Sequence, residues 1–324
     1  MISNIFLSFI TGIVTHVCMC AETELDLKKH IVPDYTQLSY EQRKEYAPNE
    51  IGKKLFDIMT AKKTNLAVAL DTESLESVIK IAQLIGSYIC ILKIHADILK
   101  DFFSENQSTR TSFDSEKFVL KKIPLIYELK KIANDLNFLI MEDRKFADIG
   151  SVVQQQYTGG PFQIAHWADL VTAHSLSGGG MIEAMQEALN KENIKEPRGV
   201  IMLPQMSTKD NLLTSEYTLR TIMQIIQLKE KGINLPTGLI TRSKIAFKNK
   251  QLDYGMLRMT PGIGLFEHTN KDQQYITPQK AFENLGTDIA IVGRAIYNSQ
   301  NPIETAQELQ QKCWNEYSQR IYKE

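Results

Sequence analysis

From residue 51 onward, the chain alternates short apolar runs of strand length with amphipathic stretches of helical length. Eight such runs, with helical stretches between them, predict an α/β fold with a parallel sheet. We expect a closed (β/α)8 TIM barrel, because an open doubly wound sheet usually carries a glycine-rich turn after its first strand. Here the first strand ends in Asp71-Thr72-Glu73, without glycine. The predicted strands are Leu66–Asp71, Ile89–Lys93, Phe138–Glu142, Asp169–Ala173, Gly199–Leu203, Gly238–Thr241, Met256–Thr260 and Asp288–Val292. The predicted helices are Leu75–Ile85, Leu125–Leu136, Met181–Leu189, Tyr217–Lys229 and Pro302–Tyr322.

Length and charge exclude several classes of protein. The 324 residues suit one large barrel domain. Lys and Arg number 37 against 38 Asp and Glu, and this balance excludes a broadly basic nucleic-acid binder. The four cysteines are too few and too scattered for a disulfide framework, so we expect a reducing compartment.

The N-terminal region does not follow the barrel pattern. Residues 1–21 form an apolar extension, residues 22–50 read as a charged, irregular arm, and residues 51–324 form the barrel domain. The apolar run of the extension is too short to span a bilayer comfortably. A secretory signal carries Lys or Arg before its apolar run, and here neither residue precedes it. Three interpretations stay open: a secretory signal, a short membrane-associating tail, or an upstream extension of a reading frame that starts at Met19. We prefer the last and expect a cytoplasmic protein without stable membrane association.

Charged residues follow the ends of three successive predicted strands. Asp71 closes the first strand, Lys93 closes the second, and Asp143, Lys145 and Asp148 follow the third. The C-terminal ends of strands in a parallel barrel meet at one mouth, where catalytic residues gather. Like charges about 4 Å apart repel by ~4 kcal/mol at an effective dielectric of ~20, so interleaved lysines would keep the carboxylates ionised. A solvated loop is the alternative for any one of these charges, but five together favour a catalytic site.

Glycines and an arginine follow the last two predicted strands. The turn Thr260-Pro261-Gly262-Ile263-Gly264 comes after the seventh strand, and Gly293-Arg294 comes after the eighth. Barrels commonly bind a phosphate between these two loops. Glycine lets backbone N–H groups approach the anion, and the guanidinium of Arg294 can hold it by two hydrogen bonds. The pair of motifs predicts a phosphate site.

The histidines give no metal signal. His95, His166 and His174 lack the spacing of metal ligands, and we predict no metal site.

Several separated motifs resemble the orotidine 5'-phosphate decarboxylase family, in the version of fungal enzymes and of the C-terminal half of animal UMP synthase. The resemblance extends in the same order from about Ile51 to Tyr322. Its motifs are M-E-D-R-K-F-A-D-I-G from Met141, T-N-L-A-V-A-L-D ending at Asp71, L-K-I-H-A-D-I-L from Leu92, W-A-D-L-V-T-A-H from Trp167, Q-Q-Y from Gln273 and G-R-A-I from Gly293.

The resemblance implies a role for each matching residue. It assigns Lys93, Asp143 and Lys145 to the catalytic network of one subunit, with Asp148 reaching the neighbouring site of a homodimer. It further implies that Asp71 and Lys93 hold the ribose and that Ser207 contacts the pyrimidine. The phosphate-binding residues that it implies are Gln273, Tyr275 and Arg294, and the other substrate-binding residues are His95 and Pro261.

The chain also departs from the family pattern. Val152 stands where the family usually has Thr near the partner's ribose, Ala69 replaces a Ser, and Ile94 replaces a Thr between Lys93 and His95. The polar insertion Ser104–Glu116 and the arm before Ile51 are not familiar from the family.

The implied activity is the conversion of orotidine 5'-phosphate to UMP and CO2 without a metal or an organic cofactor. Lys145 would stabilise the charge left on C6 of the pyrimidine and then protonate it. The polar loop from Gln205 to Thr214 is long enough to be a lid over the site. Two alternatives stay open: a Mg²⁺-dependent sugar-phosphate decarboxylase on a related barrel, and an inactive barrel that binds a phosphorylated ligand.

Overall fold

A computed structural model describes residues 34–103, 124–265, 269–270 and 273–322. The predicted apolar extension of residues 1–21 and the insertion of residues 104–116 lie outside these residues. The described residues from 35 onward belong to one compact unit, and all that follows concerns that unit.

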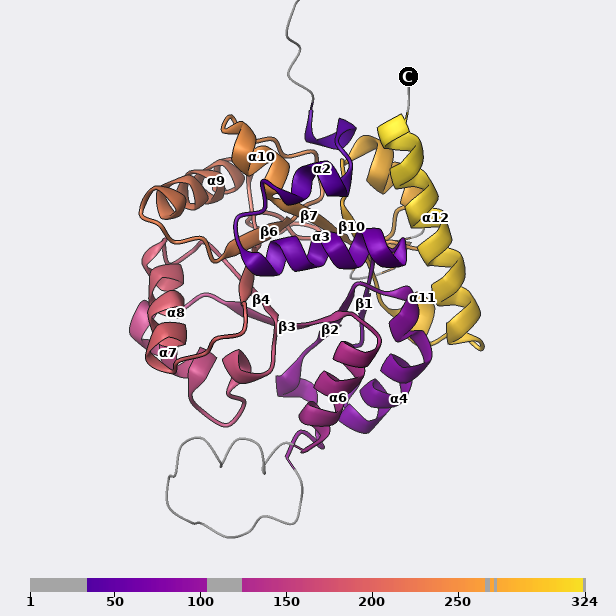
Figure 1. Ribbon diagram of the computed structural model, residues 1–324, viewed down its shortest axis with the longest axis horizontal. Coiled ribbons are helices and arrows are strands. Elements are labelled where there is room, and N and C mark those ends of the chain that lie inside the picture. The colour runs from indigo at the N-terminus through magenta and orange to yellow at the C-terminus, as the bar shows by residue number, and fades with distance from the viewer. Residues whose placement is uncertain (1–33, 104–123, 266–268, 271–272, 323–324) are drawn as a thin grey trace, which may run out of the picture. The chain divides into compact units, whose positions relative to one another are not determined.

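Eight parallel strands close into a barrel in the order β1-β10-β7-β6-β5-β4-β3-β2 (Figure 1). Each of the eight predicted runs contains or overlaps one of these strands, so the predicted (β/α)8 barrel is confirmed. All residues of most strands are buried, as their continuous apolar sequences require. The strands are β1 (Leu66–Ala69), β2 (Ile91–Ile94), β3 (Leu139–Phe146), β4 (Leu170–Ala173), β5 (Gly199–Met202), β6 (Pro236–Ile240), β7 (Leu257–Pro261) and β10 (Ile289–Val292).

Helices surround the barrel and follow its strands (Figure 1). All five predicted helices are present, whereas α7, α10 and α11 were not predicted. Polar side chains cap the start of some of these helices: the Ser74 hydroxyl accepts a hydrogen bond from the backbone N–H of Ser77 in α4, and the Thr214 hydroxyl accepts one from that of Tyr217 in α9. The helices are α4 (Leu75–Ile85), α6 (Pro124–Asp135), α7 (Gly150–Thr158), α8 (Gly180–Lys191), α9 (Ser215–Glu230), α10 (Lys250–Gly255), α11 (Arg294–Tyr297) and α12 (Pro302–Tyr322).

The described part of the predicted arm is ordered and packs on the floor of the barrel. Residues 35–50 contain α2 (Tyr40–Lys44) and the start of α3 (Glu50–Lys62), so the prediction of an irregular segment is wrong there. Arg43 is fully buried, and its guanidinium binds the Asp288 carboxylate just before β10, with Nη2 and Oδ2 2.9 Å apart. This ion pair connects the segment to the barrel across 245 positions of sequence, which is why no local pattern predicts it.

Aromatic packing joins the same segment to the last helix. The ring of Tyr40 stacks on that of Tyr317 in α12, with centroids 3.9 Å apart, and the Tyr40 backbone N–H donates to the Tyr317 hydroxyl at 2.8 Å. The Tyr40 hydroxyl in turn donates to the Asp288 carbonyl. The floor of the barrel is therefore made from both ends of this unit.

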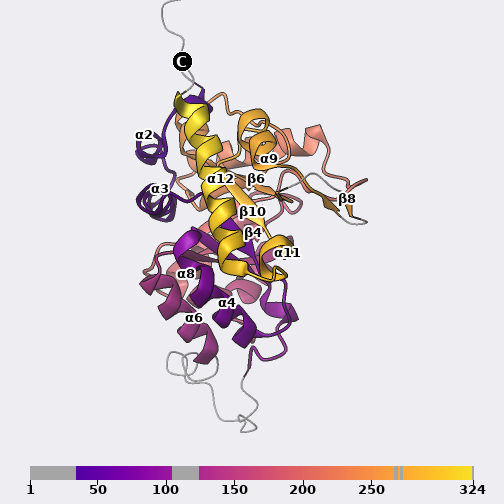
Figure 2. The same cartoon turned by 90° about the vertical axis from the view of Figure 1, so that its right-hand side faces the viewer.

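The opposite end of the barrel is its mouth. A small antiparallel hairpin of β8 (Thr269–Asn270) and β9 (Gln273–Gln274) follows β7 there, on the side away from α2 and α3 (Figure 2). The sequence analysis did not predict this hairpin. Among the described residues, no helix combines the length and the apolar character needed to cross a membrane.

Candidate active site

A cavity of about 470 Å³ opens at the mouth of the barrel. Nine of the eleven predicted site residues line it, and they come from the loops and strand ends around the whole barrel. These nine are Asp71, Lys93, His95, Asp143, Lys145, Ser207, Pro261, Tyr275 and Arg294.

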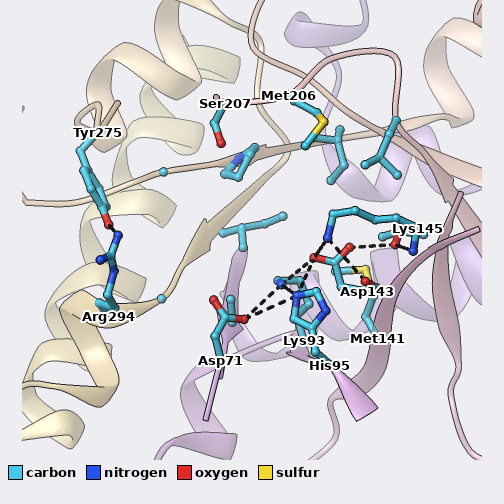
Figure 3. Close-up of a pocket in the computed structure, with 18 of the residues that line it drawn as sticks. Asp71, Lys93, His95, Met141, Asp143, Lys145, Met206, Ser207, Tyr275 and Arg294 are labelled. Atoms are coloured by element: carbon cyan, nitrogen blue, oxygen red, sulfur yellow. Dashed lines mark hydrogen bonds and ion pairs between the residues drawn. The ribbon is translucent and has the colours of Figure 1, made fainter. Parts of the chain in front are cut away.

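Asp143 is the centre of a charged cluster on one side of the cavity (Figure 3). Its Oδ2 atom lies 2.7 Å from Nζ of Lys93, 2.9 Å from Nζ of Lys145 and 3.3 Å from Nε2 of His95. Lys93 also reaches Oδ1 of Asp71 at 3.5 Å. The predicted network of alternating acids and bases is therefore present as side-chain contacts.

Burial and charge act against each other in this cluster. Burial alone would raise the pKa of Asp143, but Lys93, His95 and Lys145 hold it well below its usual range. Burial would likewise lower the pKa of Lys93, but Asp143 and Asp71 outweigh it and raise that pKa. Both directions favour the ionised pair, so the cluster keeps a carboxylate and an ammonium in contact at neutral pH.

The neighbouring carboxyl group behaves in the opposite way. Glu142 precedes Asp143 in β3 and is fully buried, and its Oε2 accepts a hydrogen bond from the backbone N–H of Ala96 at 2.9 Å. No described group donates a hydrogen bond to Oε1. Burial raises the pKa of Glu142 to about 8, so this side chain is mostly neutral at pH 7.

A second polar group lies across the cavity from Asp143 (Figure 3). Arg294 begins α11 directly after β10, and its Nη2 donates to the Tyr275 hydroxyl at 3.0 Å. The turn after β7 brings Gly262 to the cavity wall with a φ of 76°, a conformation that favours glycine. A guanidinium and a glycine turn at this place have the character of the predicted phosphate site.

One predicted site residue whose side chain the structure describes, Asp148, does not line the cavity. Asp148 is exposed beyond the end of β3, next to Ile149, which is 63% exposed. Gln273 belongs to β9, and its backbone pairs with that of Asn270.

The cavity also contains residues that the sequence analysis missed. Thr172 in β4 donates a hydrogen bond to Oδ1 of Asp143 at 2.8 Å. Thr172 is a polar residue next to the end of a predicted strand, and this position was the feature of the sequence that could have indicated a place in the site. Apart from Gly262 and Gly293 of the predicted phosphate turns, the remaining lining residues are largely apolar and cannot be told from core residues in the sequence: Ala69, Met141, Leu203, Met206, Ile240, Ile291 and Tyr297. Within the described residues, no group of three or more His, Cys, Asp and Glu side chains could hold a metal ion.

The fold and the site define a (β/α)8-barrel enzyme with an aspartate–lysine cluster at its mouth. The sequence profile of the orotidine 5'-phosphate decarboxylase / HUMPS family matches residues 64–309, and the chain belongs to this family.

Curated relatives match nearly the whole chain. The orotidine 5'-phosphate decarboxylase of Pichia kudriavzevii is 37% identical over 285 residues, covering 87% of this chain and 99% of the relative. The enzyme of Candida glabrata is also 37% identical, with 87% and 98% covered. The uridine 5'-monophosphate synthase of Naegleria gruberi is 37% identical over 287 residues, which cover 88% of this chain but 53% of that longer protein.

Solved structures share the fold. A putative orotidine-monophosphate decarboxylase from Toxoplasma gondii superposes with a TM-score of 0.58 at 16% identity, covering 84% of this chain and 98% of that one. The Methanocaldococcus jannaschii orotidine 5'-monophosphate decarboxylase, complexed with the inhibitor BMP, has a TM-score of 0.52 at 20% identity and covers 77% and 98%.

Proposed function

We propose that this chain is a carboxy-lyase that converts orotidine 5'-phosphate to UMP and CO2. The observation that carries the proposal is the Lys93–Asp143–Lys145 cluster, which shares one cavity with Arg294 and Tyr275. Family membership and the match to decarboxylases over almost their full length support the same substrate.

The charges that line the cavity favour one orientation of the bound substrate. The phosphate would lie at Arg294 and Tyr275, with Pro261 and Gln273 beside it, because Arg294 is the only arginine among the described residues that line the cavity. The ribose would face Asp71, Lys93 and His95, and the pyrimidine would reach Ser207. This direction places the C6 carboxylate of the pyrimidine beside Asp143 and Lys145.

The reaction then breaks the bond between C6 and the carboxylate carbon. CO2 leaves, the electron pair stays on C6, and the Lys145 ammonium stabilises it before its proton moves to C6. Asp143 holds Lys145 in place through the contact of 2.9 Å. The phosphate contacts are remote from C6, so their binding energy can serve to order the loop of residues 205–214 over the site.

We further propose a homodimer with composite sites. Asp148 is exposed, lies outside the cavity of its own chain, and is followed by the largely exposed Ile149. A carboxylate in this position can reach the site of a partner chain. Cytoplasmic localisation and a reaction without metal or organic cofactor are parts of the same proposal.

The test is an absorbance assay with orotidine 5'-phosphate in the presence of EDTA. We expect turnover to UMP under these conditions. Turnover only of a keto-acid sugar phosphate, and only with Mg²⁺, would assign the chain to the other decarboxylase class. Binding of UMP without any turnover would identify an inactive barrel.

A further inference from the structure

Thr172 lies between the two residues on which the proposed reaction depends most. It is 1% exposed in β4, yet its side chain lines the cavity. Its hydroxyl accepts a hydrogen bond from the backbone N–H of Lys145 at 2.9 Å and donates one to Oδ1 of Asp143 at 2.8 Å. One oxygen atom therefore joins the backbone of the lysine to the carboxylate of the aspartate.

The same place is an irregularity in the pairing of β3 with β4. Glu142 pairs with Val171 and Phe146 with Ala173, so residues 143–145 lie opposite Thr172 alone. Lys145 has a φ of 53°, in the left-handed region that residues with a side chain seldom adopt. Bulges beside active sites re-aim side chains, and the Thr172 hydroxyl gives the Lys145 N–H a partner inside this one.

The two oxygens of Asp143 have different partners. Oδ2 contacts the cations Lys93 and Lys145, whereas Oδ1 accepts the hydrogen bond from Thr172. The Asp143 side chain is only 11% exposed, so water has little access to replace a lost donor. Without the hydroxyl, rotation of the carboxylate would carry Oδ2 away from Lys145.

We propose that Thr172 is a positioning residue of the decarboxylation. Its hydroxyl holds the Asp143 carboxylate and the Lys145 backbone in the arrangement that aims the Lys145 ammonium at C6. Thr172 acts through these two residues and not on the reacting atoms. The inference rests on the proposed function and adds a residue to its machinery.

The test compares Thr172→Ala with Thr172→Ser, because both lack the methyl group and only the second keeps the hydroxyl. We expect the kcat of Thr172→Ser to stay within about 3-fold of the wild-type value. The kcat of Thr172→Ala should fall roughly 10- to 100-fold, which is the rate change that corresponds to losing a hydrogen bond to a charged group. KM and UMP affinity should change by less than about 3-fold in both variants, because the lost interaction is not one that binds substrate.

Thr221→Ala and Thr221→Ser are the matched controls. Thr221 is also fully buried, but its hydroxyl donates to the Tyr217 carbonyl within α9. We expect these two controls to have equal kcat values. Thermal unfolding of all four variants separates loss of fold from loss of positioning.

The outcomes distinguish this inference from the proposed function. A wild-type protein that does not turn over orotidine 5'-phosphate overturns both. An active wild type with Thr172→Ala as active as Thr172→Ser overturns the role of Thr172 alone, and so does a loss that appears in KM. If Thr172→Ala does not fold, Thr172→Val, which keeps the volume, is compared with Thr172→Ser on the same criteria.

Discussion

Lys145 is the more accessible of the two lysines that contact Asp143. Its side chain is 32% exposed, against 10% for Lys93, and it faces the cavity. Lys93 is enclosed by two carboxylates and a histidine, which fix its position. A proton donor must approach the substrate and be protonated again afterwards, and the exposed position of Lys145 suits both steps.

We expect Lys145→Ala to lower kcat by at least ~1,000-fold, because it removes both the charge beside C6 and the proton donor. The fold should survive, since the side chain contributes little to the core. Steady-state kinetics with saturating orotidine 5'-phosphate measure the loss of kcat, and circular dichroism checks the fold. Near-normal turnover would show that the proton comes from another group.

Glu142 illustrates how adjacent carboxyl groups can differ in charge. Its folded-state pKa of about 8 lies above the ordinary value of 4.5, so the folded state keeps a proton that the unfolded state loses between these values. The contribution of Glu142 to the free energy of unfolding is therefore greatest below about pH 4.5 and falls as the pH rises to about 8.

We expect Glu142→Gln to flatten the pH dependence of the unfolding free energy over this interval. The amide oxygen can still accept from Ala96, but the side chain no longer titrates. Urea denaturation of both proteins at several pH values between 5 and 8 measures the two slopes. Equal slopes would mean that Glu142 is already ionised throughout the interval.

At the scale of elements, Arg43 is one of two buried α2 side chains, with Tyr40, that attach this helix to the rest of the unit. Arg43 donates to the Asp288 carboxylate and to the carbonyls of Tyr254 and Met256, and no part of it is exposed. Next to it, Lys44 forms an exposed ion pair with Asp57. The two ion pairs start from the same helix but differ in burial, so they make a matched comparison.

We expect Arg43→Met to cost about 3–5 kcal/mol of unfolding free energy, because the buried Asp288 carboxylate loses its nearest cation and, among the described residues, keeps only Arg320 at 3.5 Å and the Arg258 backbone N–H. Lys44→Met should cost less than about 1 kcal/mol, since solvent screens the exposed pair. Equilibrium urea denaturation measures both. Equal losses in the two variants would show that the Arg43 pair does not anchor the floor.

Elements differed in how well the sequence predicted them, for physical reasons. The eight strands are continuous apolar runs because both faces of the sheet are buried, and this pattern is visible without a structure. Helices α10 and α11 have six and four residues, too few to show a periodic apolar face. The arm before α3 depends on an ion pair between Arg43 and Asp288, which no local window contains.

The same difference applies to the site: residues that stand out in the sequence were predicted, and those that depend on distant contacts were not. Charged residues at strand ends are conspicuous, and most of those predicted do line the cavity. Thr172 carries no charge and lies within an apolar strand, so its contact with Asp143 becomes visible only once the β3–β4 pairing is known.

At the scale of the whole molecule, the composite-site proposal predicts complementation between inactive proteins. Homodimers of Lys93→Ala and of Asp148→Ala should both be inactive. In a mixed dimer, one site collects both substitutions and the other collects neither. Random exchange makes about half of the dimers mixed, so about a quarter of all sites become wild type by twofold symmetry.

We therefore expect an exchanged mixture to recover about a quarter of normal activity. Analytical ultracentrifugation establishes that dimers form and exchange, and the decarboxylase assay measures the recovery. An exchanged mixture that stays inactive would show that each chain builds its site alone.

The stacking of Tyr40 on Tyr317 has a consequence for synthesis on the ribosome. These two partners are 277 positions apart, and Asp288, which Arg43 requires, is also made late. At ~5–20 residues per second, α2 waits roughly 15–60 s for both. During this delay its apolar side and the open floor of the barrel have no native cover. The α2 segment of the nascent chain is thus exposed to chaperones and proteases until Tyr317 in α12 leaves the exit tunnel.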